Sequence, residues 1–228
     1  MRSGRLLNVE IANAQSKARA EAEDQRRTAG GKKTGKPPAP PKAEPSGKAQ
    51  RNFTDPESRI LKSKEGFIQG YNAQAAVDGK AQVIVAHTLT QSTSDQDQLT
   101  VLVDAIEANL GTRPKEASAD AGYCSEANLG ALADRGVAGY IATGRAKHAA
   151  DAKRGAGGPL TQAMRRKLKQ AGWRSRYRLR KQIVEPVFGQ IKQARGFRQF
   201  LLRGIEKVRA EWALICTAHN LTKLASAA

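Results

Sequence analysis

The sequence predicts an α/β fold, and three observations in its middle part support this prediction. A β-hairpin is expected over residues 66–90, because alternating and β-branched apolar residues flank the turn signal Asp78-Gly79. Apolar residues at helical spacing come next along the chain. Short apolar runs then alternate with a second helical pattern, and such alternation indicates a sheet that is covered by helices.

Capping residues, glycine and proline delimit the elements that follow the hairpin. In chain order we expect a helix capped by Ser94 or Asp95 and ending near Leu110, a strand over residues 116–120, a helix from Ser125 to Arg135 and a strand over residues 137–142. The last third of the chain is basic, and helices are expected over residues 164–170, 177–194 and 204–225.

The last of these helices has one apolar face. That face is formed by Val208, Trp212, Ile215 and Leu221. We therefore expect Trp212 and Cys216 to be core residues and not to carry chemistry.

Composition divides the chain into three parts. Residues 1–27 have helical propensity but a poor apolar face. Residues 28–52 are rich in glycine, proline and lysine, and they have too few apolar side chains to offset the entropy of ordering, so we expect a disordered basic linker. The folded domain is expected over residues 53–228.

The charge of the chain indicates a polyanionic partner, with nucleic acid as the first candidate. The 228 residues include 39 Lys and Arg against 21 Asp and Glu, a formal net charge of +18. The charge is uneven, because residues 145–203 carry 17 basic and 2 acidic side chains, whereas residues 55–144 carry 7 basic and 12 acidic ones. A folded body with a polyanion-binding flank is therefore expected. A solvated basic face is the alternative.

Several other classes of protein do not fit the sequence. Its apolar runs are far shorter than the ~20 residues of a membrane-spanning helix, and no secretory signal follows Met1. Cys124 and Cys216 are too far apart for a zinc motif or a disulfide framework, which suits a reducing compartment. No nucleophile elbow, phosphate-binding loop or dinucleotide fingerprint occurs. We expect a soluble cytoplasmic protein.

Two carboxylates stand out as candidates for chemistry. Asp120 follows a predicted strand, and Glu185 lies within a basic predicted helix, where Lys192 is two turns further along the same face. Carboxylate oxygens are the ligands that Mg²⁺ prefers, and a pair of such ions can activate a phosphodiester for cleavage. A solvated pair of opposite charges explains Glu185 and Lys192 equally well.

Five motifs in order give the chain a resemblance to bacterial insertion-sequence transposases with a DDE catalytic domain. They are Asp55-Pro56-Glu57-Ser58-Arg59, Gly70-Tyr71-Asn72-Ala73-Gln74-Ala75, Asp120-Ala121-Gly122-Tyr123, Glu185-Pro186-Val187-Phe188-Gly189-Gln190-Ile191-Lys192 and Ala218-His219-Asn220-Leu221. The resemblance extends from about Arg51 to the end of the chain. Several motifs in register make it far more specific than any one motif alone.

The resemblance implies a ribonuclease-H-like mixed sheet with flanking helices, in which three carboxylates hold two Mg²⁺ ions for nicking and strand transfer at insertion-sequence ends. Asp120 resembles the second aspartate and Glu185 the glutamate. Four residues are then expected to contact DNA phosphates: Tyr177, Arg180, Lys181 and Lys192. Of these, Tyr177 with Arg180 or Lys181 stands one residue from the spacing that is usual in the family.

The sequence departs from the family pattern in its N-terminal part. The first aspartate of the family stands in an Asp-Gly-Thr motif on the first strand, and no Asp-Gly-Thr occurs in this chain. We therefore expect an N-terminally truncated transposase, in which residues 1–27 are the remnant of an upstream helical region. The resemblance places the absent strand between the hairpin and the strand that ends at Asp120, so unpaired edges and an incomplete magnesium site are expected.

Three functions remain open at this point. In the first, the chain is a transposase catalytic fragment that is inactive alone. In the second, it is a non-catalytic remnant that binds duplex DNA through residues 145–203. In either case it can form a homo-oligomer or join an intact transposase. The third alternative is a basic nucleic-acid-binding protein without any link to transposons.

Overall fold

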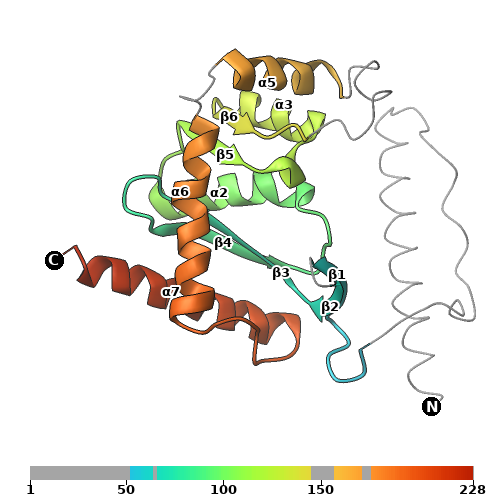
Figure 1. Ribbon diagram of the computed structural model, residues 1–228, viewed down its shortest axis with the longest axis vertical. Helices are drawn as coiled ribbons and strands as arrows, with labels where there is room; N and C mark the ends of the chain where they lie inside the picture. Colours follow the sequence, from blue (N-terminus) through green and yellow to red (C-terminus); the bar gives the residue numbers. More distant parts are fainter. Residues whose placement is uncertain (1–51, 64–65, 145–156, 171–175, 228) are drawn as a thin grey trace, which may run out of the picture. The chain divides into compact units, whose positions relative to one another are not determined.

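The described chain contains both strands and helices, which alternate between residues 84 and 141, so the predicted α/β class is confirmed (Figure 1). The computed structural model describes residues 52–63, 66–144, 157–170 and 176–227. The predicted helix over residues 1–27 and nearly all of the predicted linker lie outside these residues. The chain divides into two compact units, Met1–Pro56 and Glu57–Ala228, and every described helix and strand belongs to the second.

The described strands form three two-stranded sheets. Antiparallel pairs join β1 (Arg59–Ser63) to β2 (Gly66–Gly70) and β3 (Asn72–Val77) to β4 (Ile84–Thr90), whereas β5 (Glu116–Ala119) and β6 (Ala138–Ile141) are parallel. The prediction of one hairpin over residues 66–90 was wrong in its first part, because Gly66–Gly70 pairs with β1. Phe67 and Ile68 on β2 are 76% and 53% exposed, so this segment does not share the buried surface of β3.

The predicted turn between β3 and β4 is confirmed, and its local hydrogen bonds explain it. The Asp78 carboxylate accepts hydrogen bonds from the backbone N–H groups of Lys80 and Ala81, and the Asp78 N–H donates to the carbonyl of Val83. Gln82 takes a positive φ of 58° to complete the reversal. Aspartate suits such a turn because its side chain replaces backbone partners.

The helices agree with the predicted order, although their ends differ by a few residues. They are the 3₁₀ turns η1 (Gln96–Gln98) and η2 (Ala121–Tyr123), the helices α2 (Leu99–Leu110), α3 (Glu126–Asp134), α5 (Pro159–Gln170), α6 (Arg176–Gly189) and α7 (Ile205–Ala225), and the π-helical turn η4 (Gln190–Ala194). Ser125 caps α3 as predicted, because its hydroxyl accepts a hydrogen bond from the N–H of Asn128. No described helix combines the length and the apolar content that crossing a bilayer requires.

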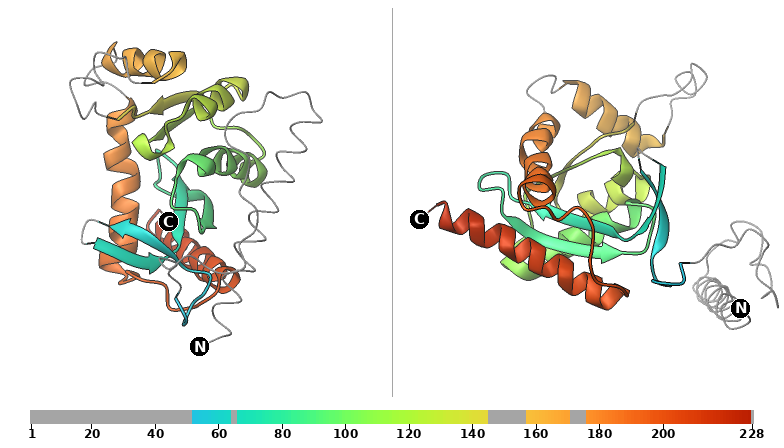
Figure 2. Two further views of the ribbon diagram at one scale, coloured as in Figure 1. Left: turned by 90° about the vertical axis from the view of Figure 1, so that its right-hand side faces the viewer. Right: turned by 60° about the horizontal axis from the view of Figure 1, so that its bottom comes forward.

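Helices lie on both sides of the strands of the second unit. Two views show α6 on one side of β5 and β6, and α2 and α3 on the other (Figures 1 and 2). Two apolar clusters correspond to these two sides. One joins α6, η4 and α7 to β3 and β4, and the other joins α2 and α3 to β5 and β6.

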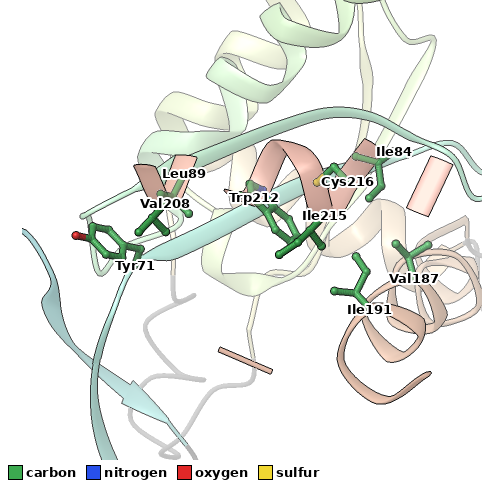
Figure 3. Packing of buried hydrophobic residues seen from close by; sticks show 9 residues of the cluster. All are labelled: Tyr71, Ile84, Leu89, Val187, Ile191, Val208, Trp212, Ile215 and Cys216. Atoms are coloured by element: carbon green, nitrogen blue, oxygen red, sulfur yellow. The ribbon is translucent and has the colours of Figure 1, made fainter. Parts of the chain in front are cut away.

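The first cluster is centred on α7 (Figure 3). Its buried members are Tyr71, Ile84, Leu89, Val187, Ile191, Val208, Trp212, Ile215 and Cys216. The core positions predicted for Trp212 and Cys216 are thus confirmed. Leu221 was wrongly assigned to the same face, and it is 60% exposed. Leu221 follows Trp212 by nine residues. Because an α-helix turns by about 100° per residue, Leu221 lies on the side of the helix opposite Trp212.

The motif Ala218-His219-Asn220-Leu221 anchors α7 to β4. The Asn220 amide donates to the carbonyl of Ile84 and accepts from the N–H of Ile84, both at 2.8 Å, as a neighbouring strand would. His219 is fully buried, with its Nε2 2.9 Å from the carbonyl oxygen of Gln82 and its Nδ1 3.1 Å from Arg195. Burial lowers the pKa of His219. These contacts indicate a structural role for both residues.

Candidate functional site

The strands β3 and β5 border a cleft with a volume of about 680 Å³. Side chains of α2 and α6 line its walls. At the end where β3 begins and β5 ends, the lining is polar, with Asn72, Gln74, Asp95, Asp120 and Tyr123. This polar end contains Asp120, which the sequence analysis singled out.

Asp95 is held at the polar end by two side-chain amides. Its Oδ1 accepts hydrogen bonds from Nδ2 of Asn72 at 2.7 Å and from Nε2 of Gln74 at 2.8 Å. Gln74 also donates to Oδ1 of Asn72, and only 4% of Gln74 is exposed. Of the two expected caps, Ser94 or Asp95, the Asp95 side chain makes no cap hydrogen bond and binds these amides of β3 instead, whereas the Ser94 hydroxyl accepts a hydrogen bond from the N–H of Gln96 at 3.3 Å.

Asp120 directly follows β5 and begins the turn η2. Its Oδ1 accepts a hydrogen bond from the N–H of Gly122 at 3.0 Å, and its carbonyl accepts one from Tyr123. A Cβ atom on Gly122 would lie 2.7 Å from Oδ2 of Asp95 and 3.1 Å from Oδ1 of Asp120. Both carboxylates therefore converge on Gly122, which accounts for a glycine in the Asp120-Ala121-Gly122-Tyr123 motif.

The phenol of Tyr123 lies in the electrostatic field of this pair. Burial raises the pKa of Tyr123, and the negative charges of Asp95 and Asp120 raise it further. Tyr123 is therefore a neutral side chain at physiological pH. It supplies a polar O–H group beside two carboxylates without adding a third negative charge.

Glu185 lies on α6, beside the cleft but not in its lining. Its side chain is 56% exposed, and its Oε1 is 3.8 Å from Nη2 of Arg180. Its neighbours Arg180, Val184 and Phe188 do line the cleft. The structure thus brings Asp120 together with Asp95 and directs Glu185 to Arg180. Within the described ranges no three Asp, Glu, His or Cys side chains converge as a metal site.

Asp95 is the site residue that the sequence analysis missed. An aspartate after a serine and before a helix is typical of a cap, and this local pattern concealed its role. The signal that could have found it is the alternation of Asn72 and Gln74 on one face of β3, because buried amides need partners.

The predicted DNA contacts lie on or beside α6. Lys181 and Lys192 are exposed, and the Nζ of Lys192 lies 5.7 Å from the centre of the Phe188 ring. Arg180 lines the cleft, and Tyr177 belongs to the helix, although its side chain lies outside those described. Much of the basic segment, residues 145–156 and 171–175, also lies outside the described residues.

Glu57, in the motif Asp55-Pro56-Glu57-Ser58-Arg59, has a structural role in the second unit. The carboxylate of Glu57 accepts a hydrogen bond from the N–H of Ile205 at 3.0 Å, at the first turn of α7. A negative charge at this end stabilises a helix, because the free N–H groups there carry partial positive charge.

Comparison with known proteins supplies the context for this geometry. A family model described as a transposase DDE domain matches residues 41–221, which is more than half of the chain. Neither the curated proteins nor the solved structures gave a match.

The packing of the acidic pair against Gly122 is testable. We expect Gly122→Ala to lower the free energy of unfolding by about 1–3 kcal/mol, because the new methyl group overlaps both carboxylates and the amides of β3 hold Asp95 in place. Urea unfolding followed by circular dichroism measures this change.

Gly189→Ala is the matched control, since Gly189 has helical backbone angles and open space around its Cβ position. This control should stabilise the protein by up to about 1 kcal/mol. Equal stability of Gly122→Ala and the unmodified protein would contradict the described convergence of the two carboxylates.

Proposed function

The chain belongs to the transposases with a DDE domain, and from this premise we propose that its second unit is a catalytic fragment that acts on DNA phosphodiester bonds at insertion-sequence ends. The observation that carries this proposal is the position of Asp120. This residue, which resembles the second catalytic aspartate of the family, directly follows a strand and shares the polar end of a cleft with a second carboxylate.

We propose a ribonuclease-H-like arrangement for the second unit. The antiparallel pair β3–β4 and the parallel pair β5–β6 lie on either side of the cleft, with helices covering both faces. This order of strands is compatible with a single mixed sheet that is interrupted between β3 and β5. The support for this assignment is the topology of the pairs together with the family.

The donor set at the polar end has the right chemistry for Mg²⁺. Asp95 and Asp120 offer adjacent carboxylate oxygens, and Mg²⁺ is commonly bound through one or two carboxylates, with water and substrate phosphate completing its shell. A divalent ion held there would neutralise negative charge that develops on a phosphodiester during cleavage. We propose Asp120, Asp95 and Glu185 as its protein ligands.

Glu185 would have to leave Arg180 to join this set. The ion pair is long, at 3.8 Å, and the Glu185 side chain is 56% exposed whereas that of Arg180 is 19% exposed, so Glu185 is the partner that is held weakly. Arg180 is proposed to contact a DNA phosphate in that arrangement. Tyr177, Lys181 and Lys192 are proposed to contact phosphates along the same helix.

The chain by itself is proposed to be inactive. The resemblance places one further aspartate in an Asp-Gly-Thr motif, and this motif does not occur in the sequence. An intact transposase, which carries this motif, is therefore a proposed protein partner. A homo-oligomer is the other proposed assembly, and double-stranded DNA is the proposed substrate. The nucleoid of a bacterial cell is the proposed location.

A second candidate function is DNA binding without cleavage. The 17 basic and 2 acidic side chains of residues 145–203 favour it, because they would bind duplex DNA even if no metal site forms. Both candidate functions share this binding surface, and they differ in whether Asp120 takes part in chemistry.

DNA binding is tested by its dependence on salt. The full chain should bind duplex DNA with an affinity that falls steeply as salt rises, because each phosphate contact releases a counterion. Lys192→Gln should weaken binding and lower the slope of log affinity against log salt by about 1. Fluorescence anisotropy with labelled duplexes measures both quantities.

Lys207→Gln is the control for this binding experiment. Lys207 is exposed on α7, outside the basic segment, so its replacement should leave the slope unchanged. An affinity of the unmodified chain that is insensitive to salt would contradict phosphate contacts altogether.

Cleavage is tested with the purified chain, Mg²⁺ and DNA that carries insertion-sequence ends. We expect nicking at the background level of Asp120→Asn, because the aspartate of the family's Asp-Gly-Thr motif is missing from the sequence. The assay is gel electrophoresis of end-labelled DNA. Mg²⁺-dependent nicking by the unmodified chain that Asp120→Asn abolishes would show that the chain alone is catalytic, contrary to the proposal.

A further inference from the structure

Strands β1 and β2 form a two-stranded ribbon whose base is fixed to the second unit. Ser58, directly before β1, and Tyr71, directly after β2, are each only 8% exposed. The Ser58 hydroxyl donates a hydrogen bond to Oε1 of Gln69 at 3.2 Å. The carbonyl of Glu57 accepts another from Nε2 of Gln91 at 2.7 Å. The ribbon therefore begins and ends at residues that the rest of the unit holds in place.

Neither face of the ribbon is covered at its far end. Phe67 and Ile68 follow each other in β2, so their side chains point to opposite faces. They are 76% and 53% exposed, and Lys62, the cross-strand partner of Phe67, is exposed as well. A single exposed apolar residue is common on protein surfaces. Two of them on opposite faces of one thin element show that the described chain leaves both sides of the ribbon open there.

The charge of the ribbon favours a polyanionic partner. Its two strands, of five residues each, together carry two basic side chains, Arg59 and Lys62, and no acidic one. Cross-strand partners share a face with Cβ atoms about 5 Å apart, so the ammonium group of Lys62 accompanies the Phe67 ring. A second copy would bring the same positive charges on a chain with a net charge of +18, and the two ribbons would repel each other. DNA, the substrate that the family implies, has the opposite charge.

The ribbon also lies close to the polar end of the cleft. Asn72 lines that end together with Asp95 and Asp120, and Figure 1 shows the ribbon beside the start of β3, where Asn72 lies. Phe67 precedes Asn72 by five residues. An extended chain spans at most about 3.6 Å per residue, so their Cα atoms are at most about 18 Å apart. Base pairs of a duplex are about 3.4 Å apart, so DNA that passes the polar end can contact the ribbon within about five base pairs.

The apolar character of the tip decides which part of the DNA it can contact. Phosphates are charged, and base edges in both grooves present hydrogen-bonding groups that an apolar ring would leave without partners. The flat faces of the bases are apolar, but a duplex exposes them only where two stacked pairs are separated. Proteins that bind the minor groove separate such pairs by inserting a side chain such as phenylalanine, with Arg, Lys or Gln contacts beside it.

From these observations we propose that Phe67 is a wedge that inserts between two neighbouring base pairs from the minor groove and kinks the duplex. Lys62, on the same face, binds a phosphate next to the kink. Phe67 and not Ile68 is the wedge, because Phe67 is more exposed and has the basic side chain beside it. The wedge rests on the proposed function, since it requires binding to duplex DNA, but it does not require cleavage.

A wedge of this kind should prefer DNA that is easily unstacked. Insertion costs free energy, and the cost is smaller where the pairs are already mismatched. The full chain should therefore bind a duplex with two central mismatches about tenfold more tightly than a fully paired duplex of the same length and phosphate number. Fluorescence anisotropy measures both affinities. Salt-dependent binding without this preference would overturn the wedge and leave the proposed function standing, whereas no binding to either duplex would overturn both.

Two variants separate the wedge from the phosphate contact. Phe67→Ala should abolish the preference for mismatched DNA and leave the slope of log affinity against log salt unchanged. Lys62→Gln should lower that slope by about 1 and keep the preference. Phe67→Leu should keep most of the preference, because leucine also serves as a wedge. A preference that survives in Phe67→Ala would overturn the proposal.

Leu214→Ala is the matched control for the loss of an exposed apolar side chain. Leu214 is 70% exposed on α7, outside the ribbon, so its replacement should leave the preference unchanged. Because Phe67 is so exposed, Phe67→Ala should unfold at the same urea concentration as the unmodified chain. An equal loss of preference in Leu214→Ala would overturn the wedge, because the Phe67 ring would then not be the cause.

The kink itself is measured by energy transfer between fluorophores at the two ends of a short duplex. The unmodified chain should bring the ends closer together, since inserted side chains kink DNA by about 20–90°, and Phe67→Ala should bind with a smaller change. The same end-to-end distance with both proteins would overturn the proposal. If the ribbon joined two copies of the chain instead, Phe67→Ala would lower the sedimentation coefficient without DNA and keep the preference for mismatches, which would also overturn it.

Discussion

Helix α6 holds together two sheets that no backbone hydrogen bond connects in the described part of the chain. It contacts β3 on one side of the cleft and β5 and β6 on the other, and Val187 of α6 and Ile191 of the following turn η4 are almost completely buried. Burial of such side chains contributes about 1.5–3 kcal/mol each. The same packing fixes the face of α6 that carries Glu185 beside the cleft, so the fold and the candidate site depend on one set of contacts.

The polar end of the cleft is built by residues that serve the fold and the site together. Gln74 is buried and needs partners, and it finds them in Asp95 and Asn72. The carboxylate of Asp95 is thereby directed to Gly122, where Asp120 also arrives. Two carboxylates lie at one end of the cleft and the basic helix α6 lies along its side, and the proposed function depends on this distribution of charge.

Local patterns of the sequence predicted the elements, but not the contacts that depend on tertiary structure. The turn at Asp78 and the cap by Ser125 were predicted because each is determined by hydrogen bonds within a few residues. The pairing of Gly66–Gly70 with β1 was missed, since it depends on which surface is buried. Asp95 was offered, beside Ser94, only as a cap, because its partners on β3 lie more than twenty residues away. Asp120 was singled out because a carboxylate after a short strand is a local signal, and its catalytic role stays a prediction.

Hydrogen exchange of single backbone amides tests most directly whether β5 has an open edge. In the isolated chain, the N–H of Ser118 should exchange orders of magnitude faster than that of Ala117, which points to β6, although both belong to one short strand. Nuclear magnetic resonance of the labelled protein resolves the two amides. Equally slow exchange of both would mean that the edge is already paired, and the account of two sheets joined by α6 across an open cleft would be wrong.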